Sequence, residues 1–357
     1  MARKRLLRRT GQGLVTRQVS IVDVAREARV SVATASRILS NSDYPVSPET
    51  RARVLEAARR LDYVPDAFAR ALVRRRTGII ALTVHDIADP YFAEIARAVE
   101  DACQADGYRA LICSTDRDPD KEIRVIRSFR AFRPDGLILG GGCVEDPAHV
   151  ENLRREIASL TVRGTRVVAL SRHPTGVPMV RVDNVAVARA ATEHVISLGH
   201  RRIACICGQP NFTTSTDRFE GYRQALAAHD IPFDPDLVVV GWYTWAGGYQ
   251  AARELLARGV DFSALVASTD IMAIGALVAL REAGIDVPDR VSLVSMNDLP
   301  IASVVEPPLT AVSFRGRDLG ALAVRLILDA LEGQEIPQDT VLGFELKVRR
   351  STRPLTD

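Results

Sequence analysis

The sequence predicts an α/β protein with a small helical head, and three observations lead to this fold class. Three short stretches near the N-terminus carry apolar residues at helical spacing. From Gly78 onward, apolar runs of strand length alternate with amphipathic stretches of helix length, which is typical of parallel sheets buried on both faces. This α/β part contains about 280 residues, enough for two sheets rather than one.

The first two helices form a predicted helix-turn-helix. Ser20, with Asp23 three residues later, has the spacing of a capping box and marks the start of the first helix. The apolar stripe of this helix consists of Ile21, Val24, Ala25 and Ala28. After a break at Arg29, Ser31 can cap a second helix, and its inward residues are Ala35, Ile38 and Leu39. Two short helices joined by about three residues make this motif.

A third helix is predicted to begin after Ser47, because Pro48 and Glu49 favour the first helical turn. Its predicted buried stripe consists of Val54, Leu55, Ala58 and Leu61. The three stripes together can close one small core.

The second helix has the character of a DNA recognition helix. Its exposed N-terminal end would face base edges in the major groove. Arg37 could pair with guanine through two hydrogen bonds, while Val32 and Ala33 could contact thymine methyl groups. The alternative is a surface arginine on an ordinary three-helix unit.

Charge supports the DNA-binding interpretation. Residues 1–76 contain 17 Lys and Arg against 7 Asp and Glu, a balance of +10, so the other 281 residues carry −7 of the total +3. A basic patch binds phosphates without reading sequence, and its affinity falls with salt. Residues 1–18 are expected to form a disordered basic arm. A transit peptide or a wrongly assigned start codon would explain the same residues.

Strands and helices of the α/β part follow one another along the chain. The strand-length runs, rich in Val, Ile and Leu, are Ile79–Val84, Ala110–Cys113, Leu137–Leu139, Val167–Leu170, Ile203–Ile206, Leu265–Ala267 and Val291–Val294. The helix-length stretches between them include Phe92–Gln104, Ala186–Leu198, Asp217–Ala228 and Asp270–Ala283.

The head resembles that of the lactose-repressor/galactose-repressor (LacI/GalR) regulators. The resemblance lies in Asp23-Val24-Ala25, Val30-Ser31, Thr34-Ala35-Ser36-Arg37, Val46-Ser47, Thr50-Arg51 and Tyr63-Val64-Pro65, followed by Ala69 and Leu72. It implies a DNA-binding domain over 19–65 and a hinge helix with linker over 66–77. The implied DNA contacts are Val32, Ala33, Thr34, Ser36, Arg37, Ala69 and Leu72.

Leu72 would be the wedge that enters a base step of the minor groove and kinks the duplex. A plain linker leucine is the alternative for this residue. Two positions depart from the family pattern. Arg29 stands where the turn usually has glycine, so a left-handed backbone position would carry a side chain. Asp66 stands where asparagine is common, and we expect it to cap the hinge helix.

The resemblance continues through the α/β part. Its motifs are Asp89-Pro90-Tyr91-Phe92, Val182-Asp183-Asn184, Leu198–Ala204, Arg218–Tyr222, Asp270–Ala276 and Pro307–Thr310. They imply a periplasmic-binding-protein-like effector-binding and dimerisation domain over 78–357. Its N-lobe would span about 78–179 and 309–337, and its C-lobe about 180–308 and 338–354. Three crossovers are expected near 178–182, 307–312 and 336–340.

An effector would bind in the cleft at the carboxyl ends of the strands. The residues carried over to this site are Asp89, Phe92, Ser171, Arg172, Arg218, Trp242, Tyr243, Thr269, Asp270 and Asn297. Carboxylates that hydrogen-bond sugar hydroxyls in the family are fewer at these positions, while the cations Arg172 and Arg218 are present. Because a cationic cleft favours an anion, we expect a sugar acid or sugar phosphate rather than a neutral sugar. For Arg218 the alternative is a surface ion pair.

The sequence argues against an enzyme and predicts no catalytic residues. His85, His173 and His200 could be proposed as acid–base groups, but no nucleophile elbow, phosphate loop or metal spacing accompanies them. Gly140-Gly141-Gly142 lacks the spacing of a dinucleotide site. No cofactor and no metal is therefore expected.

The five cysteines form no metal pattern, and Cys205 and Cys207 should point to one face of a strand as small core residues. With no signal peptide and no long apolar run, the chain is expected in the cytoplasm, without a membrane partner. The nearest rival, a secreted solute receptor, would have no use for the DNA-binding head. The expected function is a repressor that binds a pseudo-palindromic operator as a homodimer.

Overall fold

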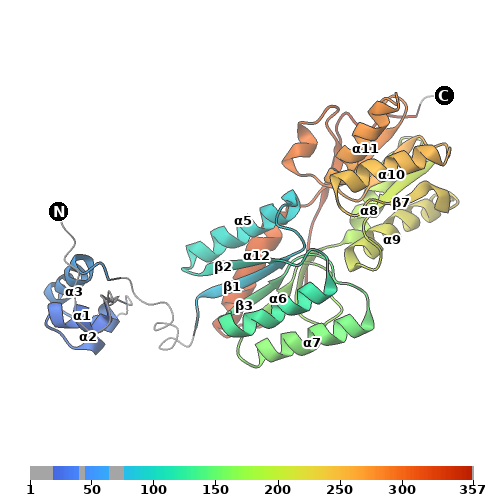
Figure 1. Cartoon of the computed structure of the whole chain (residues 1–357). Coiled ribbons are helices and arrows are strands. Elements are labelled where there is room, and N and C mark those ends of the chain that lie inside the picture. The colour runs from blue at the N-terminus through green and yellow to red at the C-terminus, as the bar shows by residue number, and fades with distance from the viewer. Residues whose placement is uncertain (1–18, 40–44, 64–75, 356–357) are drawn as a thin grey trace, which may run out of the picture. The chain divides into compact units, whose positions relative to one another are not determined.

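The computed structural model describes residues 19–39, 45–63 and 76–355, which fall into two compact units divided between Thr77 and Gly78 (Figure 1). The basic arm 1–18 lies outside the described residues. So do Ala69 and Leu72 of the expected hinge helix.

The first unit contains the three expected helices, α1 (Ile21–Glu27), α2 (Val32–Leu39) and α3 (Pro48–Arg60). The predicted caps form. The Asp23 carboxylate accepts hydrogen bonds from the Ser20 backbone N–H and hydroxyl at 2.9 and 2.7 Å. The hydroxyls of Ser31 and Ser47 accept from backbone N–H groups three residues later, at 3.0 and 3.2 Å. These bonds satisfy donors that a helix start leaves unpaired.

The core of this unit is small and is made of short side chains, namely Val24, Ala25, Ala28, Ala35, Ile38, Val54, Ala57 and Ala58. The prediction that Leu55 is buried is wrong, because its side chain is 43% exposed. The stripe of α3 instead follows Val54, Ala57 and Ala58, which keep the helical spacing that Leu55 breaks. Arg29 has φ 53°, so the left-handed turn expected from the missing glycine is confirmed.

The second unit begins with a six-stranded parallel sheet in the order β11-β5-β4-β3-β1-β2. Its strands are β1 (Ile79–Val84), β2 (Arg109–Ser114), β3 (Gly136–Leu139), β4 (Arg166–Ala169), β5 (Met179–Val182) and β11 (Asp339–Leu342). One face packs against α5 (Pro90–Ala105) and α12 (Gly316–Leu331). The other face packs against α6 (Pro119–Phe132) and α7 (Pro147–Thr161), as Figure 1 shows. We call this body the N-lobe.

A second six-stranded sheet has the order β12-β10-β9-β8-β6-β7, with only β12 antiparallel. Its strands are β6 (Ile203–Cys207), β7 (Val238–Val240), β8 (Ala264–Ala267), β9 (Ser292–Asn297), β10 (Thr310–Ser313) and β12 (Glu345–Lys347). Helices α10 (Trp245–Ala257) and α11 (Asp270–Glu282) cover one face. Helices α8 (Asn184–Ser197) and α9 (Thr213–Ala228) cover the other. This body is the C-lobe.

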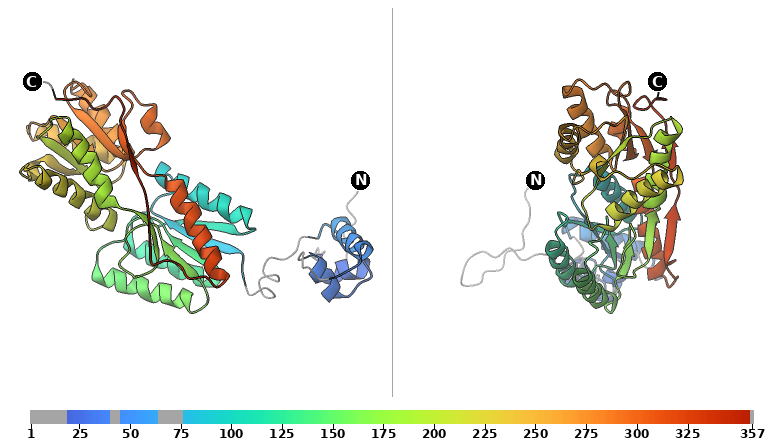
Figure 2. Two further views of the ribbon diagram at one scale, coloured as in Figure 1. Left: turned by 180° about the vertical axis from the view of Figure 1, so that it is seen from behind. Right: turned by 90° about the vertical axis from the view of Figure 1, so that its right-hand side faces the viewer.

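The chain crosses between the lobes three times: after β5, between β10 and α12, and between β11 and β12. Figure 2 shows the last of these segments running from the first sheet to the second. Each crossover lies a few residues later than expected. The strands β5 (Met179–Val182) and β11 (Asp339–Leu342) belong to the N-lobe sheet and β10 (Thr310–Ser313) to the C-lobe sheet, so the expected boundaries at 179/180, 308/309 and 337/338 are wrong. Local periodicity predicts a strand but not the sheet that it joins.

Candidate functional site

The first unit presents the N-terminal part of α2 to solvent. The side chain of Val32 is 42% exposed, and Ala33 and Arg37 are also exposed. Thr34 and Ser36 are half-buried, and the Thr34 hydroxyl lies 2.8 Å from that of Ser31. An exposed helix end with an arginine one turn further on has the geometry that major-groove readers use.

In the second unit, a cleft between the lobes lies at the carboxyl ends of the strands. Seven of the ten predicted effector residues line it: Asp89, Phe92, Ser171, Arg218, Tyr243, Thr269 and Asn297. The N-lobe contributes residues that follow β1, β3 and β4, and the C-lobe contributes α9 and residues that follow β7, β8 and β9. Open α/β sheets leave a ligand crevice at this edge.

Arg218 is the central cation of the cleft, with a side chain that is only 6% exposed. Its Nε donates to Asn184 Oδ1 at 2.8 Å and its Nη2 to Asn297 Oδ1 at 3.2 Å, while Nη1 donates to the Ser268 carbonyl. The guanidinium also lies over the ring of Phe314, 5.5 Å from its centroid. Within the described residues no ion pair joins Arg218 to a carboxylate, so the buried charge is held by neutral groups.

A second cation, Arg117, enters the cleft from the N-lobe, from the loop after β2. Its Nη2 lies 3.5 Å from Asp89 Oδ2, and its guanidinium lies 5.3 Å from the centroid of the Tyr243 ring. Its Nε is a buried donor without a hydrogen-bond partner among the described residues. Burial raises the pKa of Asp89, and the Arg117 charge opposes that shift.

His85 lies in the aromatic floor of the cleft. Its ring packs edge-to-face on Phe92 of the N-lobe at 5.4 Å and on Phe212 of the C-lobe at 5.5 Å. Burial lowers the pKa of His85 to about 3, so the ring is neutral at physiological pH. A neutral, buried imidazole against two aromatic rings is a packing residue of this site.

Three predicted effector residues do not line the cleft. Arg172 pairs with Asp217 at 2.8 Å and with Glu145 at 2.9 Å, and its side chain is 42% exposed. Trp242 is 54% exposed and is not among the residues that line the cleft. Asp270 is fully buried behind the cleft, where it accepts hydrogen bonds from the Ser295 hydroxyl and the Leu299 N–H. All three residues follow the end of a strand, but their side chains do not line the cleft.

The structure also brings into the cleft several residues that were not predicted as effector contacts. They are His85, Tyr91, Arg117, Gly141, Gly142, Leu170, Val182, Asn184 and Thr214. Most lie within a few residues of a strand end or a helix start, which is the signal that could have found them. Arg117 also lies three residues after β2 and two before α6, but in an irregular loop with φ 57° that no sequence motif marks.

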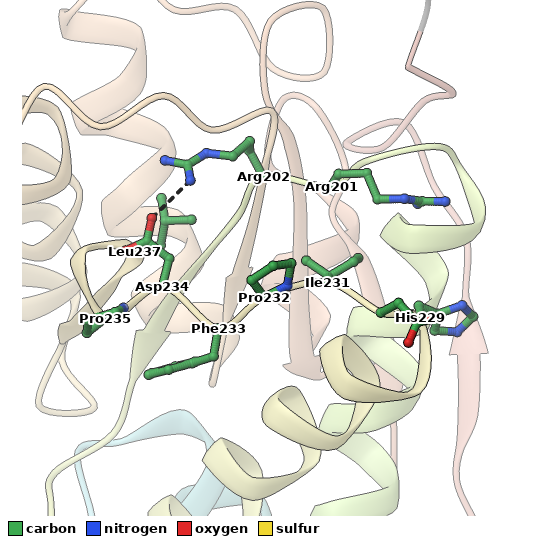
Figure 3. A pocket seen from close by; sticks show the side chains of 10 residues that line it. Arg201, Arg202, His229, Ile231, Pro232, Phe233, Asp234, Pro235 and Leu237 are labelled. Atoms are coloured by element: carbon green, nitrogen blue, oxygen red, sulfur yellow. Dashed lines mark hydrogen bonds and ion pairs between the residues drawn. The ribbon is translucent and has the colours of Figure 1, made fainter.

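Another hollow of about 500 Å³ lies on the C-lobe, away from the strand ends that form the cleft (Figure 3). Its arginines are engaged: Arg202 pairs with Asp234 at 2.9 Å, and Arg201 donates to the carbonyls of Ile196 and His200. This hollow therefore presents no converging set of polar groups, in contrast to the cleft.

The described residues contain no cluster of three His, Cys, Asp or Glu side chains that could hold a metal ion. Cys205 and Cys207 lie on one face of β6 with their sulfurs 3.4 Å apart, as predicted. In the same part of the chain no helix has the length and apolar character to cross a membrane.

Two protein families match the chain. Residues 20–66 match the family described as bacterial regulatory proteins, lacI family, and residues 192–352 match a periplasmic binding protein-like domain.

Relatives match over nearly the whole chain. The transcriptional regulator DegA of Bacillus subtilis is 34% identical over 95% of this chain and 99% of its own length. The ribose operon repressor of Halalkalibacterium halodurans is 33% identical over 94% of this chain and 97% of its own. Among solved structures, the transcriptional regulator CelR in complex with cellobiose is 32% identical, covers 94% of this chain and 100% of its own, and has a TM-score of 0.69.

Proposed function

The chain belongs to the lacI family of bacterial regulatory proteins and is a transcriptional regulator rather than an enzyme, and we propose that it is a repressor. In this proposal, a small molecule bound in the interlobe cleft controls how tightly the repressor binds operator DNA. The observation that carries the proposal is the pairing of two sites in one chain. One is the exposed start of α2, and the other is the cleft around the buried Arg218.

Two segments of the head would contact DNA, namely α2 and the hinge segment. Val32, Ala33, Thr34, Ser36 and Arg37 would face the major groove from α2. Ala69 and Leu72, which lie outside the described residues, would enter the minor groove, with Leu72 as the wedge. Two hinge segments side by side require two chains, so we propose a homodimer on a pseudo-palindromic operator. A regulator of DNA would work in the cytoplasm.

The effector is a sugar or a sugar derivative in this proposal, since one relative is named for ribose and the CelR structure contains cellobiose. We propose further that it is an anion, a sugar acid or a sugar phosphate. Arg172 no longer supports this idea, because Glu145 and Asp217 neutralise it. Arg117 takes its place: together with Arg218 it gives two cations against Asp89, and its buried Nε has no hydrogen-bond partner among the described residues.

Control of DNA binding would follow from movement of the lobes. When an effector changes the angle between them, the N-lobes of a dimer shift and the spacing of the two heads changes. A coupling of roughly 1–3 kcal/mol suffices, and DNA must then change effector affinity by the same factor.

The test starts with DNA. Genomic fragments bound by the full chain are selected and sequenced, and the operator so defined is titrated with the protein. We expect a two-fold related site and an affinity that falls steeply with salt. Failure to enrich any sequence would contradict the proposal.

Calorimetry tests the anionic effector separately, with glucose 6-phosphate and gluconate against glucose, and ribose 5-phosphate against ribose. The proposal expects heat of binding from an acid or phosphate form. Tight binding of the neutral sugars alone would contradict it.

A further inference from the structure

Two chain segments from opposite lobes meet at one end of the cleft. Residues 143–145 follow β3 in the N-lobe, and residues 211–217 include the start of α9 in the C-lobe. Val144 and Phe212 form an antiparallel bridge. The Thr213 N–H donates to the Cys143 carbonyl at 3.0 Å, and the Glu145 N–H donates to the Asn211 carbonyl at 2.7 Å. The lobes are thus joined by backbone hydrogen bonds outside their sheets.

Side chains strengthen this contact. The Thr216 hydroxyl donates to Glu145 Oε2 at 2.6 Å. The other oxygen of Glu145 lies 2.9 Å from Arg172 Nη2, and the same guanidinium pairs with Asp217 of the C-lobe at 2.8 Å. Arg172 thereby bridges one carboxylate from each lobe. A network of half-buried charges is worth more than an isolated surface pair.

The contact also has an apolar base and adjoins the ligand-lining residues. Phe212 is 4% exposed and packs edge-to-face on His85 of the N-lobe. Gly142, which lines the cleft, has no room for a side chain, because a Cβ there would lie 2.7 Å from the Thr214 hydroxyl oxygen. The segments therefore seal that end of the cleft.

The cleft that they seal is narrow. It encloses about 50 Å³, well below the roughly 300 Å³ at the lower end of small-molecule sites. A pyranose-sized ligand therefore needs more room than this arrangement of the lobes leaves.

We propose that residues 143–145 and 211–217, with Arg172, form a clasp that holds the lobes closed over the cleft, and that any effector has to open it. Glu145 and Arg172 are positioning residues. They do not touch the ligand, but their interactions oppose opening of the lobes and so lower the apparent affinity for the ligand. The apparent effector affinity equals the intrinsic affinity multiplied by the fraction of molecules in which the clasp is open. The clasp would act in the same way on any effector.

Hydrogen exchange on the full chain, with no small molecule added, tests the clasp. The amides of Glu145 and Thr213 should be protected in the wild type, because both are bonded across the lobes. In Glu145→Ala and in Arg172→Met they should exchange up to about fivefold faster, as expected for loss of partly exposed ion pairs. In Glu145→Gln, which keeps an acceptor for Thr216, the increase should be smaller.

Glu151→Ala is the matched control, because Glu151 is an exposed N-lobe glutamate paired only with arginines of its own helix. It should leave the clasp amides unchanged, and in all variants the amides of β3 should keep their protection. If the two clasp amides exchanged as fast as unbonded amides in the wild type, the clasp would not exist. If they stayed protected in Glu145→Ala and Arg172→Met, these side chains would not hold it. Neither result would affect the proposed operator and effector.

Discussion

Arg37 is the residue on which base recognition depends in our account. It is exposed on α2, one turn after Val32 and Ala33. We expect Arg37→Met to weaken operator binding by roughly 1–3 kcal/mol and to relax the preference at one base pair, because a bidentate guanine contact is lost. Competition binding against operators changed at single positions measures both effects.

Arg26→Met is the control for this experiment, since Arg26 is an exposed arginine on α1 that pairs with Asp23 at 3.8 Å. It should weaken binding to all sequences equally or not at all. Equal losses of specificity in the two variants would show that Arg37 does not read a base.

Asp270 predicts a pH dependence of stability. Burial raises the pKa of this carboxyl to about 7, against the hydrogen bonds from Ser295 and Leu299. The pKa of Asp270 is therefore higher in the folded state than in the unfolded state. The contribution of the protonated carboxyl to folding stability is fully present below pH ~3.8 and is lost as the pH rises to about 7. Between pH 5 and 8 the wild type should therefore lose stability relative to Asp270→Asn.

The fluorescence of Trp242 and Trp245, the only two tryptophans, follows unfolding of the C-lobe and measures this difference. Asp289→Asn is a suitable control, because Asp289 is exposed and pairs with Arg353. A constant difference between wild type and Asp270→Asn across this pH range would contradict the assignment.

At the residue scale, the sequence located the cleft better than it located the side chains in it. Arg218, Asn297 and Tyr243 line the cleft as predicted. Arg172 and Asp270 follow strands as well, but Arg172 turns to Asp217 and Asp270 caps a buried loop. Side-chain direction at a strand end depends on partners from distant segments, and no local pattern contains that information.

At the scale of the elements, the turn between α1 and α2 contains a strained backbone position, and this strain can be tested. Arg29 has φ 53°, a backbone conformation that costs a residue with a Cβ roughly 1–2 kcal/mol and costs glycine little. We expect Arg29→Gly to slow hydrogen exchange of the buried amides of α1 and α2, since the first unit becomes more stable.

The control for the turn is Arg26→Gly, inside α1, where glycine lowers helix stability by about 1 kcal/mol. The two substitutions remove the same side chain type within one unit but should act in opposite directions. Destabilisation by both would mean that the turn is not strained.

Helices and strands were predictable where local patterns are strong. The caps at Ser20, Ser31 and Ser47 begin helices as expected, and β1 matches its predicted bounds. The C-terminal strands β11 and β12 were not assigned, because each has only three or four residues with little apolar character. Their pairing with β5 and β10 depends on contacts over long sequence separations.

In the whole molecule, three proposed properties depend on one another. The head binds DNA, the cleft binds an effector, and the clasp sets how strongly the effector must bind. An effector can shift the operator equilibrium only by its differential affinity for the two lobe arrangements. This regulation needs the DNA-binding site and the effector site in one chain. The lacI-family match covers the head, and the binding-protein-like match covers most of the C-lobe.

The most direct test of this link is the operator affinity of the full chain, measured by fluorescence anisotropy as glucose 6-phosphate, gluconate, ribose 5-phosphate and their neutral sugars are titrated. At least one acid or phosphate should shift the affinity of the wild type by a factor of about 5 to 150. Arg218→Met should bind the operator normally without these compounds and lose the shift, while Arg223→Met, changed on an exposed face of the same helix, should keep it. An operator affinity that none of these compounds changes, or that changes equally in wild type and Arg218→Met, would contradict the account.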